Sequence, residues 1–151
     1  MNYYNAIAKG YNELYGEEQL EKFEIIKNEL VGRVLDIGCG TGIITKKIEN
    51  AVGIDNSWKM LKQFDGERIL GDAHNLPFKN KTFDTALSLT VLQDLKNPSK
   101  ALKEMKRIAR KVVFSIQKRN WTEQKIKKML KKSDLKGSLF EGKKDWFFIQ
   151  K

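Results

Sequence analysis

The chain has 151 residues, of which 40% are apolar and 32% charged, and it contains one cysteine. This length suits a single domain with its own hydrophobic core, and a lone cysteine excludes an internal disulfide framework. No apolar run approaches the ~20 residues of a membrane-spanning helix, and Met1 to Gly10 lack the apolar stretch of a secretory signal. We therefore expect one domain over residues 1–151, cytoplasmic and not bound to a membrane.

The net charge of +10 is unevenly distributed along the sequence. Lys96 to Lys132 hold fourteen basic and two acidic residues, so this stretch carries more than the whole surplus. A lysine-rich proteome would explain many lysines but not their separation from Asp and Glu. A positive face for a polyanion would explain both, yet charge runs are often only solvated faces. Both interpretations stay open.

Short β-rich runs alternate with helical patterns along the sequence. The predicted strands are Arg33–Ile37, Ala51–Ile54, Arg68–Leu70, Phe83–Leu89, Lys111–Ile116, Ser138–Phe140 and Asp145–Ile149. Helical spacing or a capping serine predicts helices over Glu17–Leu30, Ile43–Glu49, from Ser57 through Leu61, from Ser99 through Ala109, and over Trp121–Lys132. This alternation favours a doubly wound, Rossmann-like α/β sheet, mostly parallel with an antiparallel C-terminal hairpin strand. Ligands of such sheets bind beyond the carboxyl ends of the strands.

A glycine cluster, Gly38 to Gly42, lies between the first predicted strand and the helix after it, and Asp36 stands just before it. Glycines permit positive φ and let the backbone approach a ligand, and the N-terminus of the following helix would favour an anionic group. Dinucleotide-binding folds use the spacing Gly-x-Gly-x-x-Gly, whereas this loop is Gly-x-Gly-x-Gly. Asp36 would repel a pyrophosphate but not a ligand with an amino group and a sulfonium. A nicotinamide dehydrogenase is therefore disfavoured.

Four motifs, in this order, resemble those of the class I S-adenosylmethionine-dependent methyltransferases. They are Val34–Gly42, Gly53–Ser57, Gly71–Phe78, and Phe83-Asp84 with Ser88–Leu92. The opening Tyr4–Asn12 is similar to a segment that precedes the fold in the ubiquinone-biosynthesis-like (type 11) branch of the family. The resemblance covers nearly the whole chain. It implies a small prokaryotic, archaeal methyltransferase that uses S-adenosylmethionine and releases S-adenosylhomocysteine.

The resemblance also implies which residues bind the cofactor. They are Asp36, Gly38, Gly40, Asp55, Asn56, Met60, Asp72, Ala73 and Leu89. Asp36 would lie near the methionine ammonium through water, and the Leu89 carbonyl would face the same group. Asp55 would accept from both ribose hydroxyls, and Asp72 would accept from the adenine amino group.

Methyl transfer from a sulfonium is an in-line displacement, so the protein needs neither a covalent nucleophile nor a metal. One cysteine and one histidine cannot build a Cys/His cluster, and no metal is expected. Cys39 is interpreted as a small residue that fits its loop and His74 as a loop or adenine-edge contact, so no catalytic residue is assigned. The acceptor is expected to contact Tyr3, Tyr4, Tyr11, Gln93, Asp94, Gln117, Asn120 and Trp121. Residues 1–30 are expected to cover the site.

The acceptor itself is not indicated by any motif, since the Asn-Pro-Pro-Tyr of amide and exocyclic-amine methyltransferases is absent after the fourth strand. An open site and the basic stretch favour RNA, bound through Lys96–Lys132, or another macromolecule. The cations expected off the apolar stripes of two helices are Lys100, Lys103, Lys106, Arg107 and Arg110, then Lys125, Lys127, Lys128, Lys131 and Lys132. A likeness of Gly71–Leu95 to RNA-modifying methyltransferases that work with a small zinc-binding activator adds a small activator protein as a possible partner. The alternatives are methylation of a quinone-like metabolite, and a non-catalytic subunit that binds the cofactor or nucleic acid.

Overall fold

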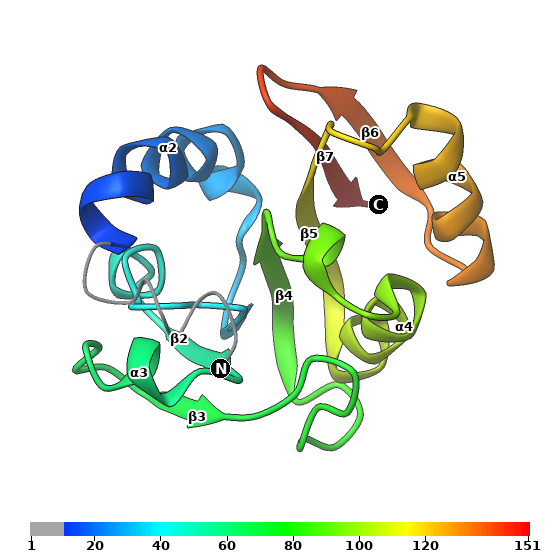
Figure 1. The fold of residues 1–151 in the computed structure, drawn as a ribbon. Helices are drawn as coiled ribbons and strands as arrows, with labels where there is room; N and C mark the ends of the chain where they lie inside the picture. The colour runs from blue at the N-terminus through cyan, green and yellow to red at the C-terminus, as the bar shows by residue number, and fades with distance from the viewer. Residues whose placement is uncertain (1–10) are drawn as a thin grey trace.

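Seven strands form one sheet in the computed structural model, which describes residues 11–151 (Figure 1). They are β1 (Val34–Ile37), β2 (Ala51–Asp55), β3 (Arg68–Leu70), β4 (Phe83–Leu89), β5 (Ala109–Gln117), β6 (Gly137–Glu141) and β7 (Asp145–Gln150). Their order across the sheet is β3-β2-β1-β4-β5-β7-β6. Strands β1 to β5 run parallel, whereas β7 is antiparallel to both of its neighbours. The predicted doubly wound α/β fold with an antiparallel C-terminal hairpin is confirmed.

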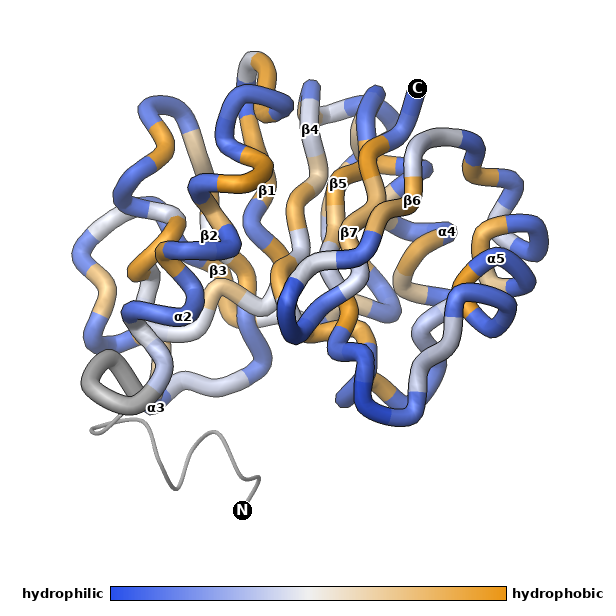
Figure 2. The backbone as a smooth tube through the Cα atoms, turned by 90° about the horizontal axis from the view of Figure 1, so that it is seen from above, coloured by the Kyte–Doolittle hydropathy of each residue, from blue (hydrophilic) through white to orange (hydrophobic). Residues whose placement is uncertain are grey.

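Helices cover both faces of this sheet. The helical elements are α2 (Tyr11–Ile26), η2 (Lys27–Glu29), η3 (Thr45–Lys47), α3 (Trp58–Leu61), η4 (Leu92–Asp94), α4 (Pro98–Ile108) and α5 (Glu123–Lys132). Successive side chains of a strand point to opposite faces. In β5, Val112 and Phe114 pack with α4 and α5, whereas Val113 packs with Phe23 and Ile26 of α2. Apolar segments gather along the central strands in Figure 2.

The helix predicted over Ile43–Glu49 is wrong, because this segment forms only the three-residue turn η3. Ile43, Ile44 and Thr45 are consecutive β-branched residues, which lose side-chain freedom in a helix. The Thr45 hydroxyl also donates to Asp36 Oδ2 at 2.8 Å. The glycine loop is therefore not followed by an α-helix, and the attraction for an anion expected from a helix N-terminus is missing.

The caps of α4 and α5 differ from the expected ones. Asn97, not Ser99, caps α4: its side chain accepts from the Lys100 amide at 3.1 Å, and Pro98 takes the first helical position, where its missing N–H costs nothing. Thr122 caps α5, so this helix begins at Glu123 rather than at Trp121. The strand β5 begins at Ala109, so Arg110 lies on a strand and not on the helix assigned to it.

The first described helix also has shifted bounds, since α2 ends at Ile26 and continues as η2 instead of reaching Leu30. Gly32 then turns the chain into β1 with φ of +60°. The cap expected at Ser57 is confirmed, because its side chain accepts from the Met60 amide at 3.3 Å. Over residues 11–151, no helix combines the length and the apolar character needed to cross a bilayer.

Candidate functional site

A cavity of about 530 Å³ lies at the carboxyl ends of β1, β2, β3 and β4; we call it the main cavity. The predicted cofactor residues in its wall are Gly38, Gly40, Asp55, Asn56, Met60, Asp72, Ala73 and Leu89. Asp36 is the one predicted member that does not line it. The location is the one at which doubly wound sheets bind ligands, and the volume is that of a small-molecule site.

The glycine loop approaches the end of β2 closely. The amides of Gly38 and Cys39 both donate to the Ile54 carbonyl, at 2.8 and 3.1 Å. Gly38 has φ of +75°, and a Cβ placed on it would stand 2.5 Å from Val91 Cγ2. Only glycine satisfies both the conformation and the space at this position.

Asp55 connects the end of β2 to this loop. Its Oδ2 accepts from the Gly40 amide and its Oδ1 from the Ser57 amide, both at 2.9 Å. Burial raises the pKa of Asp55, while the amides of Gly40, Ser57 and Asn56 act in the opposite direction. A carboxylate has about four acceptor positions, so Asp55 keeps capacity for a ligand hydroxyl while it holds the loop.

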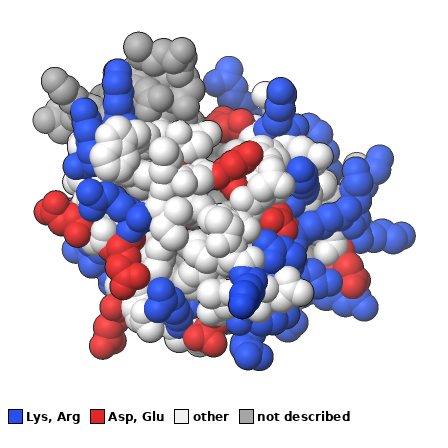
Figure 3. Space-filling view, turned by 90° about the horizontal axis from the view of Figure 1, so that it is seen from below, with Lys and Arg blue, Asp and Glu red and all other residues white. Residues whose placement is uncertain are grey.

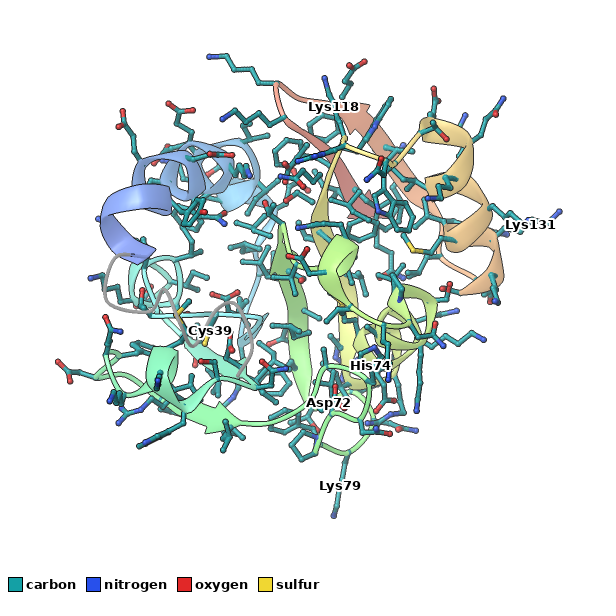
Figure 4. The ribbon with its side chains drawn as sticks, in the orientation of Figure 1. Cys39, Asp72, His74, Lys79, Lys118 and Lys131 are labelled. Carbon is teal, nitrogen blue, oxygen red and sulfur yellow. The ribbon has the colours of Figure 1, made fainter. Side chains whose placement is uncertain are left out.

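Asp72 and His74 form a polar pair in the loop after β3 (Figure 4). Asp72 Oδ1 accepts from the His74 amide at 2.9 Å and lies 2.8 Å from His74 Nδ1. The Asn97 amide donates to His74 Nε2 at 3.1 Å, which assigns the neutral tautomer with the proton on Nδ1. The hydrogen bonds from His74 lower the pKa of Asp72. His74 thus joins this loop to the cap of α4 and has no ring nitrogen left to act as a base.

Asp36 lies in a separate small cavity of about 20 Å³, which also borders Gln19, Gly38 and Leu89. Burial raises the pKa of Asp36 to about 7. The negative charge of Asp55 also raises this pKa, whereas the hydrogen bond from the Thr45 hydroxyl lowers it. Gln19 Oε1 is buried and has no hydrogen-bond partner among the described residues. Such a volume holds about one water-sized group, and the acceptors around it suit a donor such as water or an ammonium. We call this second space the small cavity. It adjoins the main cavity, because Gly38 and Leu89 line both.

Sequence reasoning missed Gln19. The signal was present, because Gln19 stands four residues before Phe23 and seven before Ile26, the buried stripe of α2. This spacing places all three side chains on the sheet-facing side of the helix.

Only some of the residues expected to contact the methyl acceptor lie at the main cavity. Asp94 lines the main cavity, whereas Gln93, Gln117 and Asn120 do not. Gln93 instead links two strand ends: its Nε2 donates to the Thr90 carbonyl at 2.7 Å, and its Oε1 accepts from the Gln117 amide at 3.3 Å. Trp121 lies under the Lys125 ammonium, 4.7 Å from the ring centroid. Tyr3 and Tyr4 lie outside the described residues, as does the side chain of Tyr11.

Cys39 is buried, and burial together with the charges of Asp36 and Asp55 raises the pKa of its thiol. A thiol held protonated in this way is a poor nucleophile, in line with the interpretation of Cys39 as a structural residue. Within residues 11–151, no group of three or more His, Cys, Asp or Glu side chains is arranged to hold a metal ion.

The basic stretch forms the outer surface of α4 and α5, two helices that pack against each other. Lys and Arg side chains crowd this side of the molecule (Figure 3), and Lys131 points away from α5 into solvent (Figure 4). Several cations of the stretch have structural partners. Arg107 pairs with Glu104 and donates to the carbonyls of Leu76 and Phe78, and Lys106 pairs with Asp134. The exposed cations without an ion pair among the described residues include Lys100, Lys103, Lys128, Lys131 and Lys132.

The family model for a methyltransferase domain matches residues 35–114, which are more than half of the chain. The chain therefore belongs to this family of methyltransferase domains. The resemblance drawn from the four motifs is confirmed.

Three relatives show the range of the similarity. A protein of Methanocaldococcus jannaschii, described as uncharacterized, is 40% identical over 114 residues, 70% of this chain and 45% of that protein. A demethylmenaquinone methyltransferase of Thermotoga maritima is 32% identical over 90 residues, 52% of this chain and 39% of that protein. An 18S rRNA (guanine-N(7))-methyltransferase of Bos taurus is 42% identical over 77 residues, 44% of this chain and 27% of that protein. The chain spans about half the length of the archaeal relatives it matches.

Solved structures share the fold across the whole domain. A methyltransferase of Thermotoga maritima, described as a possible histamine N-methyltransferase, aligns with a TM-score of 0.81 at 19% identity, over 98% of each chain. A chain from the complex between the Haloferax volcanii Trm112 methyltransferase activator and a putative methyltransferase aligns with a TM-score of 0.72 at 16% identity, over 93% of this chain and 79% of that chain. At these identities the likeness shows the fold alone.

Proposed function

We propose that this protein transfers a methyl group from S-adenosylmethionine, bound in the main cavity, to an acceptor at the same edge of the sheet. One observation carries the choice of ligand: Asp36 and Asp55 flank the glycine loop, and no α-helix follows it. An anionic pyrophosphate would meet two acidic side chains there without a helix N-terminus to offset them. A ligand with an ammonium and a sulfonium would meet complementary charge.

The residues present fit this cofactor. Asp55 has acceptor capacity for ribose hydroxyls, and Asp72 has a second carboxylate oxygen beyond the one that His74 uses. The small cavity is bordered by Asp36 and by Gln19, whose Oε1 has no partner within the described part of the chain, and this pair of acceptors fits the methionine ammonium. When bound, S-adenosylmethionine supplies an electrophilic methyl group, and the chain has only to hold the acceptor in line with it. Gln19 also supports the proposal that residues 1–30 cover the site of a single domain.

For the acceptor we propose RNA, bound through the basic region (Lys96–Lys132). Support comes from the exposed cations on the neighbouring outer faces of α4 and α5, which suit phosphate contacts that do not read sequence. The similarity to an rRNA methyltransferase agrees with this choice, while the similarity to demethylmenaquinone methyltransferases keeps a quinone-like metabolite as the competing acceptor. A small activator protein is proposed as a partner on the fold likeness to a chain solved with such an activator.

The test of the methyl donor is calorimetric titration with S-adenosylhomocysteine, followed by incubation with methyl-tritiated S-adenosylmethionine and extract from cells that lack the gene. Binding and label in a ribonuclease-sensitive fraction are expected. Label in small molecules would favour a quinone-like metabolite over RNA as the acceptor. If the protein binds S-adenosylhomocysteine but transfers no label, also after addition of a candidate activator, the non-catalytic alternative is favoured. Absence of S-adenosylhomocysteine binding would overturn the proposal that S-adenosylmethionine is the methyl donor.

The test of the acceptor surface uses matched charge variants. Replacing Lys128, Lys131 and Lys132 by Gln removes three cations from α5, and replacing Lys46, Lys47 and Lys62 by Gln removes three exposed cations elsewhere. Because the first set takes three positive charges away from the RNA phosphates, it should weaken RNA binding about tenfold or more and flatten its salt dependence. The second set should leave RNA binding nearly unchanged, and equal effects of the two sets would contradict a defined surface.

A further inference from the structure

Thr90 follows β4 in a backbone conformation that its side chain disfavours. Its φ is +59°, and a β-branched residue with positive φ is a genuine outlier. Such conformations persist where the surroundings hold them, and they gather at functional sites. Thr90 and its neighbours Leu89 and Val91 form part of the wall of the main cavity, and Val91 packs on Gly38 of the glycine loop.

A buried polar network holds Thr90 from two distant parts of the chain. Lys22 Nζ of α2 donates to Thr90 Oγ1 at 2.8 Å, and Thr90 Oγ1 donates to Asp145 Oδ2 of β7 at 2.6 Å. Ser115 of β5 donates to the same Oδ2 at 2.7 Å, and its hydroxyl accepts from the Thr90 amide at 3.0 Å. Both the amide and the hydroxyl of Thr90 are thus fixed in place.

The charges of this network are almost entirely enclosed. Lys22 is 7% exposed and Asp145 1% exposed, with Nζ and Oδ1 3.2 Å apart. Within residues 11–151 that Oδ1 makes no hydrogen bond, so its contact with Lys22 is an ion pair without hydrogen-bond geometry. Glu18 also lies 3.2 Å from Lys22 Nζ; partial burial acts to raise the pKa of Glu18, but the hydrogen bonds and charges of Lys22 and Lys144 lower it overall. Buried ion pairs contribute little net stability compared with apolar residues of the same size, so stability alone does not account for this arrangement.

Neither Lys22 nor Asp145 lines the main cavity. Both lie instead in the wall of a second cavity of about 490 Å³, between α2 and the hairpin of β6 and β7. Their hydrogen bonds to Thr90 connect both residues to the wall of the main cavity.

We propose that Lys22 and Asp145 are positioning residues for cofactor binding: they hold Thr90 in its left-handed conformation and so fix the Leu89–Val91 wall over the glycine loop. The proposal rests on the proposed function of the main cavity. It makes the C-terminal hairpin, which carries none of the cofactor motifs, part of what shapes the binding site.

The test compares Asp145→Asn, Lys22→Met and the milder Ser115→Ala with the control Lys111→Met, at a temperature where all variants are folded. Lys111 pairs with Glu29 at 3.1 Å and also joins β5 to the segment after α2, but at the opposite end of the strand. The network variants should bind S-adenosylhomocysteine about fivefold more weakly or worse, because the wall is no longer preorganised. Adding Thr90→Val to Asp145→Asn should cause little further loss, since both changes break one network. The control should lose stability with its affinity unchanged.

A second readout works without ligand. Hydrogen exchange of the Thr90 and Val91 amides should become faster in the network variants and stay unchanged in Lys111→Met. Lower stability of Asp145→Asn and Lys22→Met, with wild-type affinity and wild-type exchange at these amides, would overturn the positioning role. If the wild-type protein fails to bind S-adenosylhomocysteine, the proposed function fails. The exchange data then still decide whether the network holds Thr90.

Discussion

The Asp55 carboxylate accepts from the Gly40 amide at 2.9 Å, so the residue that ends β2 holds the loop that follows β1. The Asp55 side chain therefore both holds the loop in its conformation and lines the main cavity. A change at Asp55 should alter the stability of the protein and its affinity for the cofactor, and the two effects can be measured separately.

Asp55→Ala should weaken binding of S-adenosylhomocysteine about tenfold or more, because a hydrogen bond to a charged group contributes about 1.5–3 kcal/mol. Asp55→Asn keeps an acceptor for Gly40 or Ser57 and should retain more of the stability than of the affinity. Calorimetry and urea unfolding measure the two quantities, and Asp65→Asn, an exposed acid in the loop before β3, serves as the control. Unchanged affinity of Asp55→Ala would remove Asp55 from the binding site.

Gly38→Ala should destabilise the protein by about 1–3 kcal/mol, since the new Cβ meets both a strained φ and the Val91 side chain. The matched control is Gly16→Ala in α2, where a Cβ would meet Ile43 Cδ1 at an ordinary 3.5 Å. That change should be neutral or stabilising by up to about 1 kcal/mol through helix propensity. Equal effects of the two substitutions in thermal unfolding would contradict the close approach at Gly38.

The buried Asp36 should make stability depend on pH. Its pKa of about 7 in the folded protein exceeds the ordinary value, so the folded state keeps a proton that the unfolded chain releases. Its contribution to the free energy of unfolding is therefore complete below about pH 4 and is lost as the pH rises to about 7.

Asp36→Asn cannot ionise and still offers an acceptor to Thr45. It should be more stable than the wild type by about 2–4 kcal/mol at pH 8 and similar to it near pH 4. Urea unfolding at both pH values measures the difference. A constant difference across this range would mean that Asp36 does not titrate there.

Gln19→Met should separate stability from binding. Gln19 Oε1 is a buried acceptor without a partner among the described residues, so its removal should leave the free energy of unfolding equal or raise it by about 1 kcal/mol. Affinity for S-adenosylhomocysteine should fall about fivefold or more, because the small cavity loses an acceptor for the ammonium. The exposed Gln63→Met is the control for the chemical change. Wild-type affinity in Gln19→Met would assign the small cavity to a water molecule alone.

Local patterns in the sequence were sufficient to predict the strands and most of the main cavity. The glycine loop and Asp55 lie at strand ends, where spacing and residue type together determine position. Patterns predicted the wrong structure where two local rules compete. Pro98 favours the first helical position, so the cap of α4 is Asn97 and not Ser99. The β-branched residues after the glycine loop prevent the helix that was predicted there. The pairing of Lys22 with Asp145 could not be predicted from the sequence, because the two residues lie far apart in the chain and both bond Thr90, which follows β4.

The position of β7 between β5 and β6 has a consequence for synthesis on the ribosome. Until residues 145–150 have left the exit tunnel, the outer edge of β5 has no partner strand, and Thr90 has no Asp145 to hold it. An unpaired edge invites association with other chains. Nascent chains that stop short of β7 should therefore depend on chaperones more than the finished domain does, even though every cofactor motif has already been made.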